Sequence, residues 1–268
     1  MDIEMNSLQV LKDIYDSSKE FIAIVATPVE RPKPTSLSVL SKNQNLDGLP
    51  IWASKFGGLP YLPASVEYPK NKDGEPMHLL AQINFIDMPY LEPFPRDGLL
   101  QFYIDTHHHL YGMRFDDEES SFKALYIPNQ GSYLKSQNLG FLKETDEFPM
   151  NCVHELAFSK QKKPVSMDSP FFDKLYEIYD GQFIDGVEFY ELYHTVVESN
   201  TNHKIGGYPC FTQQAPDFLL DDQYEVLLQI GYDTHISFGD AGIASFFILK
   251  EDLKNLDFSN VIFYWDCC

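Results

Sequence analysis

Residues 55–60 have the sequence Lys-Phe-Gly-Gly-Leu-Pro, and residues 204–209 repeat it as Lys-Ile-Gly-Gly-Tyr-Pro. Two adjacent glycines allow positive φ angles that most residues avoid. The proline that follows keeps the residue before it extended. Each hexapeptide therefore predicts a sharp turn that leads into extended chain, and the pair suggests that one structural unit occurs twice.

Two further blocks repeat in the same order. Residues 79–83 (Leu-Leu-Ala-Gln-Ile) correspond to 226–230 (Val-Leu-Leu-Gln-Ile), and residues 98–104 correspond to 242–248. The spacing between copies falls from 149 to 147 and then to 144 positions, as short loop deletions between matched strands would produce. We interpret the blocks as an internal duplication. The alternative is that common strand and turn sequences arose independently in both halves.

The fold class that follows is α+β and β-dominated, with two similar antiparallel β units, an N-terminal helix and peripheral helices. Residues 1–50 form the N-terminal helix and a linker, and residues 51–127 form the first β unit. Residues 128–202 connect the units and contain helices, and residues 203–268 form the second unit. We expect the four segments to make one compact domain.

Hydrophobic periodicity places the individual elements. We expect a helix over residues 3–24, although residues 21–25 could instead begin a strand. Alternation along the strand places Leu79, Ala81, Ile83 and Phe85 on one face, and Val226, Leu228, Ile230 and Tyr232 on the matching face. The predicted strands are 79–85, 99–105, 122–127, 224–232, 243–249 and 261–265, with strand-like pieces at 140–142 and 152–158; further helices are predicted from 168–170 onward, at 187–198 and at 251–256.

Composition narrows the range of partners. The chain has 268 residues, 15% of them aromatic, and a formal net charge of −20. Such an acidic protein is repelled by nucleic-acid phosphates and by anionic membrane surfaces, so we expect neither as a partner. A basic protein partner remains compatible with this charge. A solvated acidic surface that only keeps the protein in solution is the simpler interpretation.

The sequence also predicts a cytoplasmic location. The first residues, Met-Asp-Ile-Glu-Met, lack the basic and apolar regions of a signal peptide. No apolar run approaches the roughly 20 residues needed to span a bilayer. The four cysteines are too few and too scattered for a disulfide framework.

Taken together, these blocks resemble the YwqG-like proteins, a bacterial family whose domain has no assigned function. The residues that carry the resemblance are 54–60, 80–84, 98–103, 205–209, 227–230, 238–242 and 263–265. The resemblance covers roughly residues 50–268. Phe238 stands where some members have tryptophan. The family implies a cytoplasmic, β-rich protein and implies no activity.

Gln82 and Gln229 interrupt apolar strands at corresponding positions. A buried amide without partners costs about 1–3 kcal/mol, so each amide must find partners in the fold. One interpretation is an amide that holds the backbone of a neighbouring turn. The other is a pair of ligand-facing amides at the seam between the two units.

Asp233, His235 and Asp240 are close in sequence, around the glycine-bracketed turn of the second unit. A carboxylate and an imidazole on adjacent loops can perform acid–base chemistry. Aspartates in such turns also commonly bond local backbone N–H groups. With Gln82 and Gln229, these three residues are the candidate ligand-binding residues, and no catalytic residue can be assigned.

Other features favour structural roles. His107, His108 and His109 suggest a metal, but consecutive residues of a strand face opposite sides, so at most the first and third could share an ion. An exposed loop is the simpler interpretation. Cys210 corresponds to Tyr61 in the first unit, which favours packing over nucleophilic chemistry. We therefore expect no metal site and no cofactor.

Two function classes follow. The first is a non-enzymatic binding or interaction protein, favoured by the absence of a catalytic signature and by an acidic, aromatic-rich composition. The alternative is an enzyme or small-ligand-binding protein with its site at the seam between the units.

Overall fold

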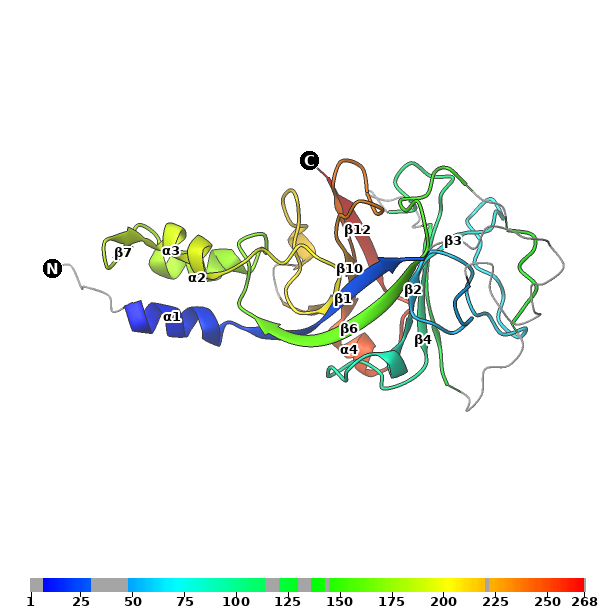
Figure 1. Cartoon of the computed structure of the whole chain (residues 1–268), viewed down its shortest axis with the longest axis horizontal. Helices are drawn as coiled ribbons and strands as arrows, with labels where there is room; N and C mark the ends of the chain where they lie inside the picture. The colour runs from blue at the N-terminus through cyan, green and yellow to red at the C-terminus, as the bar shows by residue number, and fades with distance from the viewer. Residues whose placement is uncertain are drawn as a thin grey trace.

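The computed structural model describes residues 7–29, 48–113, 121–129, 136–142, 145–219 and 222–267. Its main feature is one ten-stranded sheet in which every neighbouring pair is antiparallel (Figure 1). The strands are β1 (Lys19–Pro28), β2 (Lys55–Phe56), β3 (His78–Asn84), β4 (Leu99–Ile104), β5 (Phe122–Ile127), β6 (His154–Lys163), β9 (Lys204–Gly206), β10 (Tyr224–Ile230), β11 (Ile243–Leu249) and β12 (Ile262–Asp266). The predicted α+β, β-dominated class is confirmed.

The strand order is β12-β11-β10-β9-β1-β6-β2-β3-β4-β5. Reading outward from the centre, β1 is followed by β9, β10, β11 and β12, and β6 is followed by β2, β3, β4 and β5. Each half thus has a long strand, a short strand from the repeated hexapeptide, and three further strands in chain order. The long strands are exchanged, because β1 precedes β2 in the chain but pairs with β9, and β6 precedes β9 but pairs with β2.

The four glycines of the repeated hexapeptide all have positive φ: 69° and 75° at Gly57 and Gly58, and 75° and 76° at Gly206 and Gly207. A Cβ on Gly207 would lie 2.9 Å from the Cβ of Phe21 in β1. The glycines are therefore needed both for the turn and, in the second half, for the close approach of β1.

The N-terminal segment corrects one prediction. In the described residues, helix α1 covers Ser7–Asp16 and ends before residue 24, and Lys19–Pro28 form β1, so the alternative of a strand at residues 21–25 is the correct one. Val10 and Ile14 are the buried residues of α1. The segment 19–28 extends because all ten residues pair with β6, and this tertiary pairing outweighs the local helical pattern.

A β-bulge in each half corrects the predicted face assignments. The register shifts between Leu79 and Ala81 in β3, and between Val226 and Leu228 in β10. A bulge places one extra residue on one strand and changes which side its neighbours face. Leu79 and Val226 consequently pack on the outer side of the sheet, while the alternate residues after each bulge face the shared core; these are Ala81, Ile83, Leu228 and Ile230. The prediction that Leu79 lies on the same face as Ala81 and Ile83 is therefore wrong. The matching prediction for Val226 is wrong for the same reason.

The two halves share one apolar core on the inner side of the curled sheet. The Phe102 ring of β4 lies 4.5 Å from the Phe246 ring of β11, measured between centroids. Phe122 of edge strand β5 approaches Phe263 of the other edge strand, β12, at 5.6 Å. Buried members from the two halves include Leu80, Ala81, Ile83, Leu100, Ile104, Leu227, Leu228, Ile230, Ala244 and Ile248. The seam between the halves is therefore filled with apolar side chains.

A helical lobe lies at the far end of the β1–β6 pair and projects from the body of the sheet (Figure 1). It comprises α1 and residues 168–198, which contain α2 (Phe172–Tyr179), the hairpin β7–β8 (Phe183–Ile184 and Val187–Glu188) and α3 (Phe189–Val196). The lobe has its own small core, which includes Val10, Phe172, Tyr179, Phe189 and Tyr193. A fourth helix, α4 (Lys250–Lys254), follows β11.

Some predicted features lie outside the described residues. They are residues 3–6 of the predicted N-terminal helix and residues 30–47 of the linker that follows it.

Candidate functional site

The amide of Gln82 is fully buried and bonds backbone groups around the first Gly-Gly turn. Its Oε1 accepts from the Tyr61 N–H at 2.9 Å, and its Nε2 donates to the carbonyls of Ile51 (3.0 Å) and Ala53 (2.9 Å). Gln101 also donates to Oε1, at 2.7 Å. This amide holds the chain on both sides of the turn.

Gln229 makes the corresponding bonds in the second half. Its Oε1 accepts from the Cys210 N–H at 3.0 Å, and its Nε2 donates to the carbonyls of Asn202 (2.9 Å) and Asn200 (3.3 Å). Each partner stands 149 positions after its counterpart for Gln82. Both amides pair with segments on the outer sides of the sheet, so the structure does not bring Gln82 and Gln229 together at the apolar seam.

Each hexapeptide also contributes a fully buried lysine, Lys55 and Lys204. The Lys204 Nζ donates to the Asn200 carbonyl at 2.7 Å and lies 3.5 Å from the Cys210 Sγ. Burial lowers the pKa of Lys204, and the nearby Cys210 opposes this shift only in part. Lys204 thus helps Gln229 to hold the backbone beside the second Gly-Gly turn.

A lysine whose pKa is lowered by folding gives a testable pH dependence. Between the folded-state pKa and the ordinary value near 10.4, the unfolded chain binds the proton and the folded protein does not. Stability of the wild type relative to Lys204→Met should therefore rise with pH toward pH ~10.5, by at most about 1.4 kcal/mol per pH unit. Urea unfolding of both proteins from pH 8 upward measures this difference. A difference that stays constant or falls over that range contradicts the assignment.

The turn after β10 brings Asp233 and His235 together with His203. Asp233 Oδ1 accepts from the backbone N–H groups of His235 (2.6 Å) and Ile236 (2.9 Å). The Gly231 N–H donates to His203 Nδ1 at 3.0 Å, so the neutral His203 ring carries its proton on Nε2, 3.5 Å from Asp233 Oδ2. Burial lowers the pKa of His203, while Asp233 acts in the opposite direction.

The first half contains a similar arrangement without histidine. Ser54 occupies the position before Lys55 that His203 occupies before Lys204. The Ser54 hydroxyl donates to Asp87 Oδ2 at 2.8 Å and accepts from the Asn84 N–H at 2.9 Å. In both halves, the residue before the lysine therefore links the end of a strand to an aspartate. This parallel favours a structural role for the pair of Asp233 and His203.

His154 differs from its counterpart in the other half. His154 of β6 lies opposite Phe56 of β2, and Ile22 of β1 lies opposite Ile205 of β9, so Ile22 is the counterpart of His154. The His154 side chain is fully buried. Among the described residues, no hydrogen-bond partner reaches its Nδ1, and its Nε2 lies 3.7 Å from the Cys152 Sγ. Burial lowers the pKa of His154, with His235 and His203 acting in the same direction, while Asp233 and a hydrogen bond with the Cys152 backbone act against them.

We expect His154→Ile to stabilise the protein by about 1 kcal/mol at pH 7, because an unpaired buried polar atom costs about 1–3 kcal/mol. The unfolded chain protonates His154 near pH 6.5, before the folded protein does, so the wild type loses stability through this group as the pH falls. The advantage of the variant should therefore grow from pH 7 to pH 5. Chemical unfolding at several pH values tests this. A variant less stable than wild type at both pH values contradicts it.

His154, Cys152 and His235 bring imidazole and thiol groups close together. The rings of His154 and His235 lie 5.9 Å apart, and His235 Nδ1 bonds Asn151 Oδ1 at 2.9 Å. No set of three His, Cys, Asp or Glu side chains in the described part of the chain is arranged to hold a metal ion.

Asp240 lies apart from this group, exposed at the tip of the turn between Phe238 and Gly242. The turn packs against β12, since a Cβ on Gly239 would lie 2.7 Å from the Cys267 Sγ. The carboxylate of Asp266 in β12 accepts from the N–H groups of Thr212 (2.9 Å) and Gln213 (2.7 Å). The structure thus groups Asp233 with His235 and separates both from Asp240, Gln82 and Gln229.

The histidine run lies in a turn after β4. The His107 N–H donates to Asp105 at 3.0 Å, and the rings of His108 and His109 are 4.7 Å apart. Cys210 is fully buried and lies 3.2 Å from the Ser166 hydroxyl.

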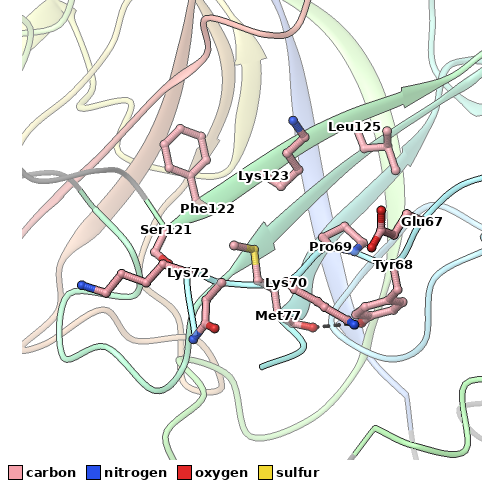
Figure 2. Close-up of a pocket in the computed structure, with 11 residues that line it drawn as sticks. Glu67, Tyr68, Pro69, Lys70, Lys72, Met77, Ser121, Phe122, Lys123 and Leu125 are labelled. Carbon is pink, nitrogen blue, oxygen red and sulfur yellow. Dashed lines mark hydrogen bonds between the residues drawn. The ribbon is translucent and has the colours of Figure 1, made fainter. Parts of the chain in front are cut away.

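A hollow of about 470 Å³ opens beside β5 (Figure 2). Lys70, Lys72 and Lys123 line it, together with Asn71 and Ser121. Asn71 and Ser121 both donate to Asp105, at 3.1 and 3.0 Å, so their polar groups are engaged. Figure 2 shows Lys72 and Lys123 extending in different directions, so their ammonium groups do not converge on one ligand.

The sequence did not single out His154, Cys152 or His203. Aligning the two hexapeptides would have paired His203 with Ser54, whereas no repeated block contains His154 or Cys152.

The sequence also gave no sign of the exposed apolar surface of the helical lobe. Thirteen large hydrophobic side chains are exposed among the described residues, and six of them belong to this lobe. They are Leu8, Tyr15, Ile178, Phe183, Val187 and Tyr190.

A search of curated proteins gives no match for the chain. In the described part of the structure, no helix combines the length and apolarity that crossing a membrane requires. The domain of unknown function DUF1963 matches residues 54–267, which is most of the chain. The protein therefore belongs to the DUF1963 family.

Proposed function

We propose that this protein is a non-enzymatic interaction protein and that the helical lobe is its docking surface. The observation that carries the proposal is the concentration of exposed apolar side chains on the lobe, with Phe183 67% and Ile178 61% exposed. Contiguous exposed apolar surface in a folded protein commonly marks a binding site. The lobe projects from the sheet, which leaves this surface accessible to a partner (Figure 1).

The small core of the lobe does not need these side chains. Phe172, Tyr179, Phe189 and Tyr193 already fill it. Tyr179 also donates to Asp13 of α1, and burial together with this bond raises the pKa of Tyr179 to about 12. The exposed rings are therefore additional to those that stabilise the lobe, which supports a role in recognition.

The proposal includes a cytoplasmic location and membership of the YwqG-like proteins within DUF1963. Among the described residues, Cys152, Cys210 and Cys267 form no disulfide, which suits a reducing compartment. The net charge of −20 supports a protein partner rather than nucleic acid or an anionic membrane.

Site-directed photo-crosslinking tests the interaction. A photoreactive amino acid replaces Phe183 in the lobe or, as a matched control, Tyr232, which is 55% exposed outside the lobe. In extracts of the source organism, we expect a discrete crosslinked protein from position 183 and none from position 232. Equal patterns from both positions would contradict a docking role for the lobe.

A second candidate function is an enzyme or small-ligand-binding protein with its site at the edge of the seam. The unpaired, fully buried Nδ1 of His154 beside Cys152, His203 and His235 favours it. Thermal-shift screening of wild type, His154→Ala and Asp240→Ala against a metabolite library tests this. A ligand whose shift is lost only in His154→Ala supports the site. If no ligand shifts the wild type, this alternative fails.

We also infer that the two halves derive from one duplicated unit. The matching strand order, the paired β-bulges and the corresponding bonds of Gln82 and Gln229 support this inference. Superposing residues 54–104 on 203–248 tests it, since unrelated strand directions after superposition would contradict a common origin.

A further inference from the structure

We propose that the partner of the helical lobe is a basic segment of another polypeptide, in which lysine or arginine side chains alternate with apolar ones. The inference rests on the proposed docking function and specifies its partner class. It depends on one face of the lobe, which we call the hairpin face and define by Tyr176, Asp180, Phe183, Glu188 and Tyr190.

The members of the hairpin face are neighbours in space. The rings of Tyr176 and Tyr190 meet edge to face at 6.3 Å. Asp180 accepts a hydrogen bond from the Tyr176 hydroxyl, and this bond is the main cause of the raised pKa of Tyr176. Phe183 lies directly opposite Glu188 in the β7–β8 hairpin. Aromatic rings and carboxylates are therefore interleaved on one surface.

The segment that carries the hairpin face is acidic, which favours a basic partner. Residues 171–198 contain seven carboxylates and a single lysine. That lysine, Lys174, has its Nζ 5.3 Å above the ring of Phe171. The carboxylates are Asp173, Glu177, Asp180, Asp185, Glu188, Glu191 and Glu198. Guanidinium and ammonium groups pair with carboxylates and also bind aromatic faces, so a basic segment satisfies both kinds of group.

Apolar anchors are needed as well as charge. Phe183 and Tyr190 are 67% and 46% exposed, and aromatic side chains commonly supply most of the energy of an interface. A purely polar basic segment would leave these side chains in water. The partner must therefore present apolar side chains between its cations.

A second copy of this chain fits the surface less well. Two hairpin faces in a symmetric dimer would place like charges against each other. Two lysines of β6 are already paired within the chain, since Lys160 bonds Glu20 at 2.8 Å and Lys163 lies 3.5 Å from Glu198. A partner with its own basic segment avoids both difficulties.

Fluorescence anisotropy with three synthetic peptides tests the partner class on the full chain. The probe is a labelled peptide built from repeats of Leu-Arg-Trp-Lys. One comparison peptide replaces its cations with glutamate, and the other replaces its apolar residues with serine. We expect the probe to bind at micromolar concentration and both comparison peptides to bind at least about tenfold more weakly.

Paired variants separate specific docking from general attraction to an acidic protein. The double variant Phe183→Ser with Tyr190→Ser keeps the net charge of the protein. It should lower the affinity for the probe at least about tenfold. Asp180→Asn with Glu188→Gln should weaken it and reduce its dependence on salt. Matched controls outside the lobe are Phe141→Ser with Tyr232→Ser, and Glu67→Gln with Asp73→Asn, and each should change the affinity less than about twofold. Melting curves confirm that every variant folds.

The outcomes distinguish the partner class from the docking function. Equal weakening by lobe variants and by controls, or equal binding of the serine peptide, overturns the partner class. Self-association that is lost in Phe183→Ser with Tyr190→Ser also overturns it, in favour of a second copy. If crosslinking from position 183 captures an acidic protein while the probe fails, the docking function stands and the partner class falls. If both experiments fail, both proposals fall.

Discussion

Replacing Phe246 by alanine is expected to lower the free energy of unfolding by about 3–5 kcal/mol. The Phe246 side chain is fully buried. Its ring stacks on Phe263 of β12 at 4.5 Å and an interplanar angle of 13°, and it meets Phe102 of β4 at 4.5 Å. Truncation removes apolar burial from both halves at once and leaves a cavity that the surrounding strands cannot close.

Urea unfolding at pH 7 measures the effect. The matched control is Phe183→Ala, a phenylalanine that is 67% exposed on the helical lobe, and it should change stability by less than about 0.5 kcal/mol. A loss below about 1 kcal/mol for Phe246→Ala, well under the range for buried aromatics, would mean that the two halves do not share a core at this ring.

The strands with strong periodicity were predictable from the sequence. Strands β5 and β11 begin and end where the pattern predicted, and β4 ends one residue earlier. These segments are rich in aromatic and β-branched residues and lie between turn signals, so local preference and tertiary pairing agree.

Local patterns failed where distant pairing decides the structure. The stretch Phe21–Val25 is compatible with helix or strand, and only its pairing with residues 157–161 makes it a strand. The bulges at Leu79 and Val226 also depend on the neighbouring strands β4 and β11. The exchange of β1 and β6 between halves is beyond sequence analysis, because the repeated blocks exclude both strands.

The candidate site was predictable only in part. Asp233 and His235 are close in sequence, and they also lie together in the structure. His154 reaches His235 because residues 149–151 run beside 235–237, which is a long-range contact that no spacing reveals. The hairpin face was equally hidden, since the same aromatic residues could all have been buried and only the packing of α2 and α3 leaves Tyr190 and Phe183 exposed.

Replacing Gln229 by leucine is expected to lower the free energy of unfolding by about 3–4 kcal/mol, because buried groups that lose their partners cost about 1–3 kcal/mol each. The Cys210 N–H and the Asn202 carbonyl lose the bonds of 3.0 and 2.9 Å that the amide makes. The Asn200 carbonyl keeps Lys204 as a donor. The loss therefore corresponds to two unpaired backbone groups, whereas leucine preserves most of the side-chain volume.

Gln82→Leu provides an independent test of the same physical reason, because its amide bonds the corresponding backbone groups at Tyr61, Ile51 and Ala53. The matched control is Gln161→Leu, an exposed amide on β6, which should change stability by less than about 0.5 kcal/mol. Urea unfolding of the three variants should give two large losses and one negligible one. If Gln82→Leu and Gln229→Leu both behave like Gln161→Leu, the amides do not hold the Gly-Gly turns, and a role for them in binding a ligand regains support.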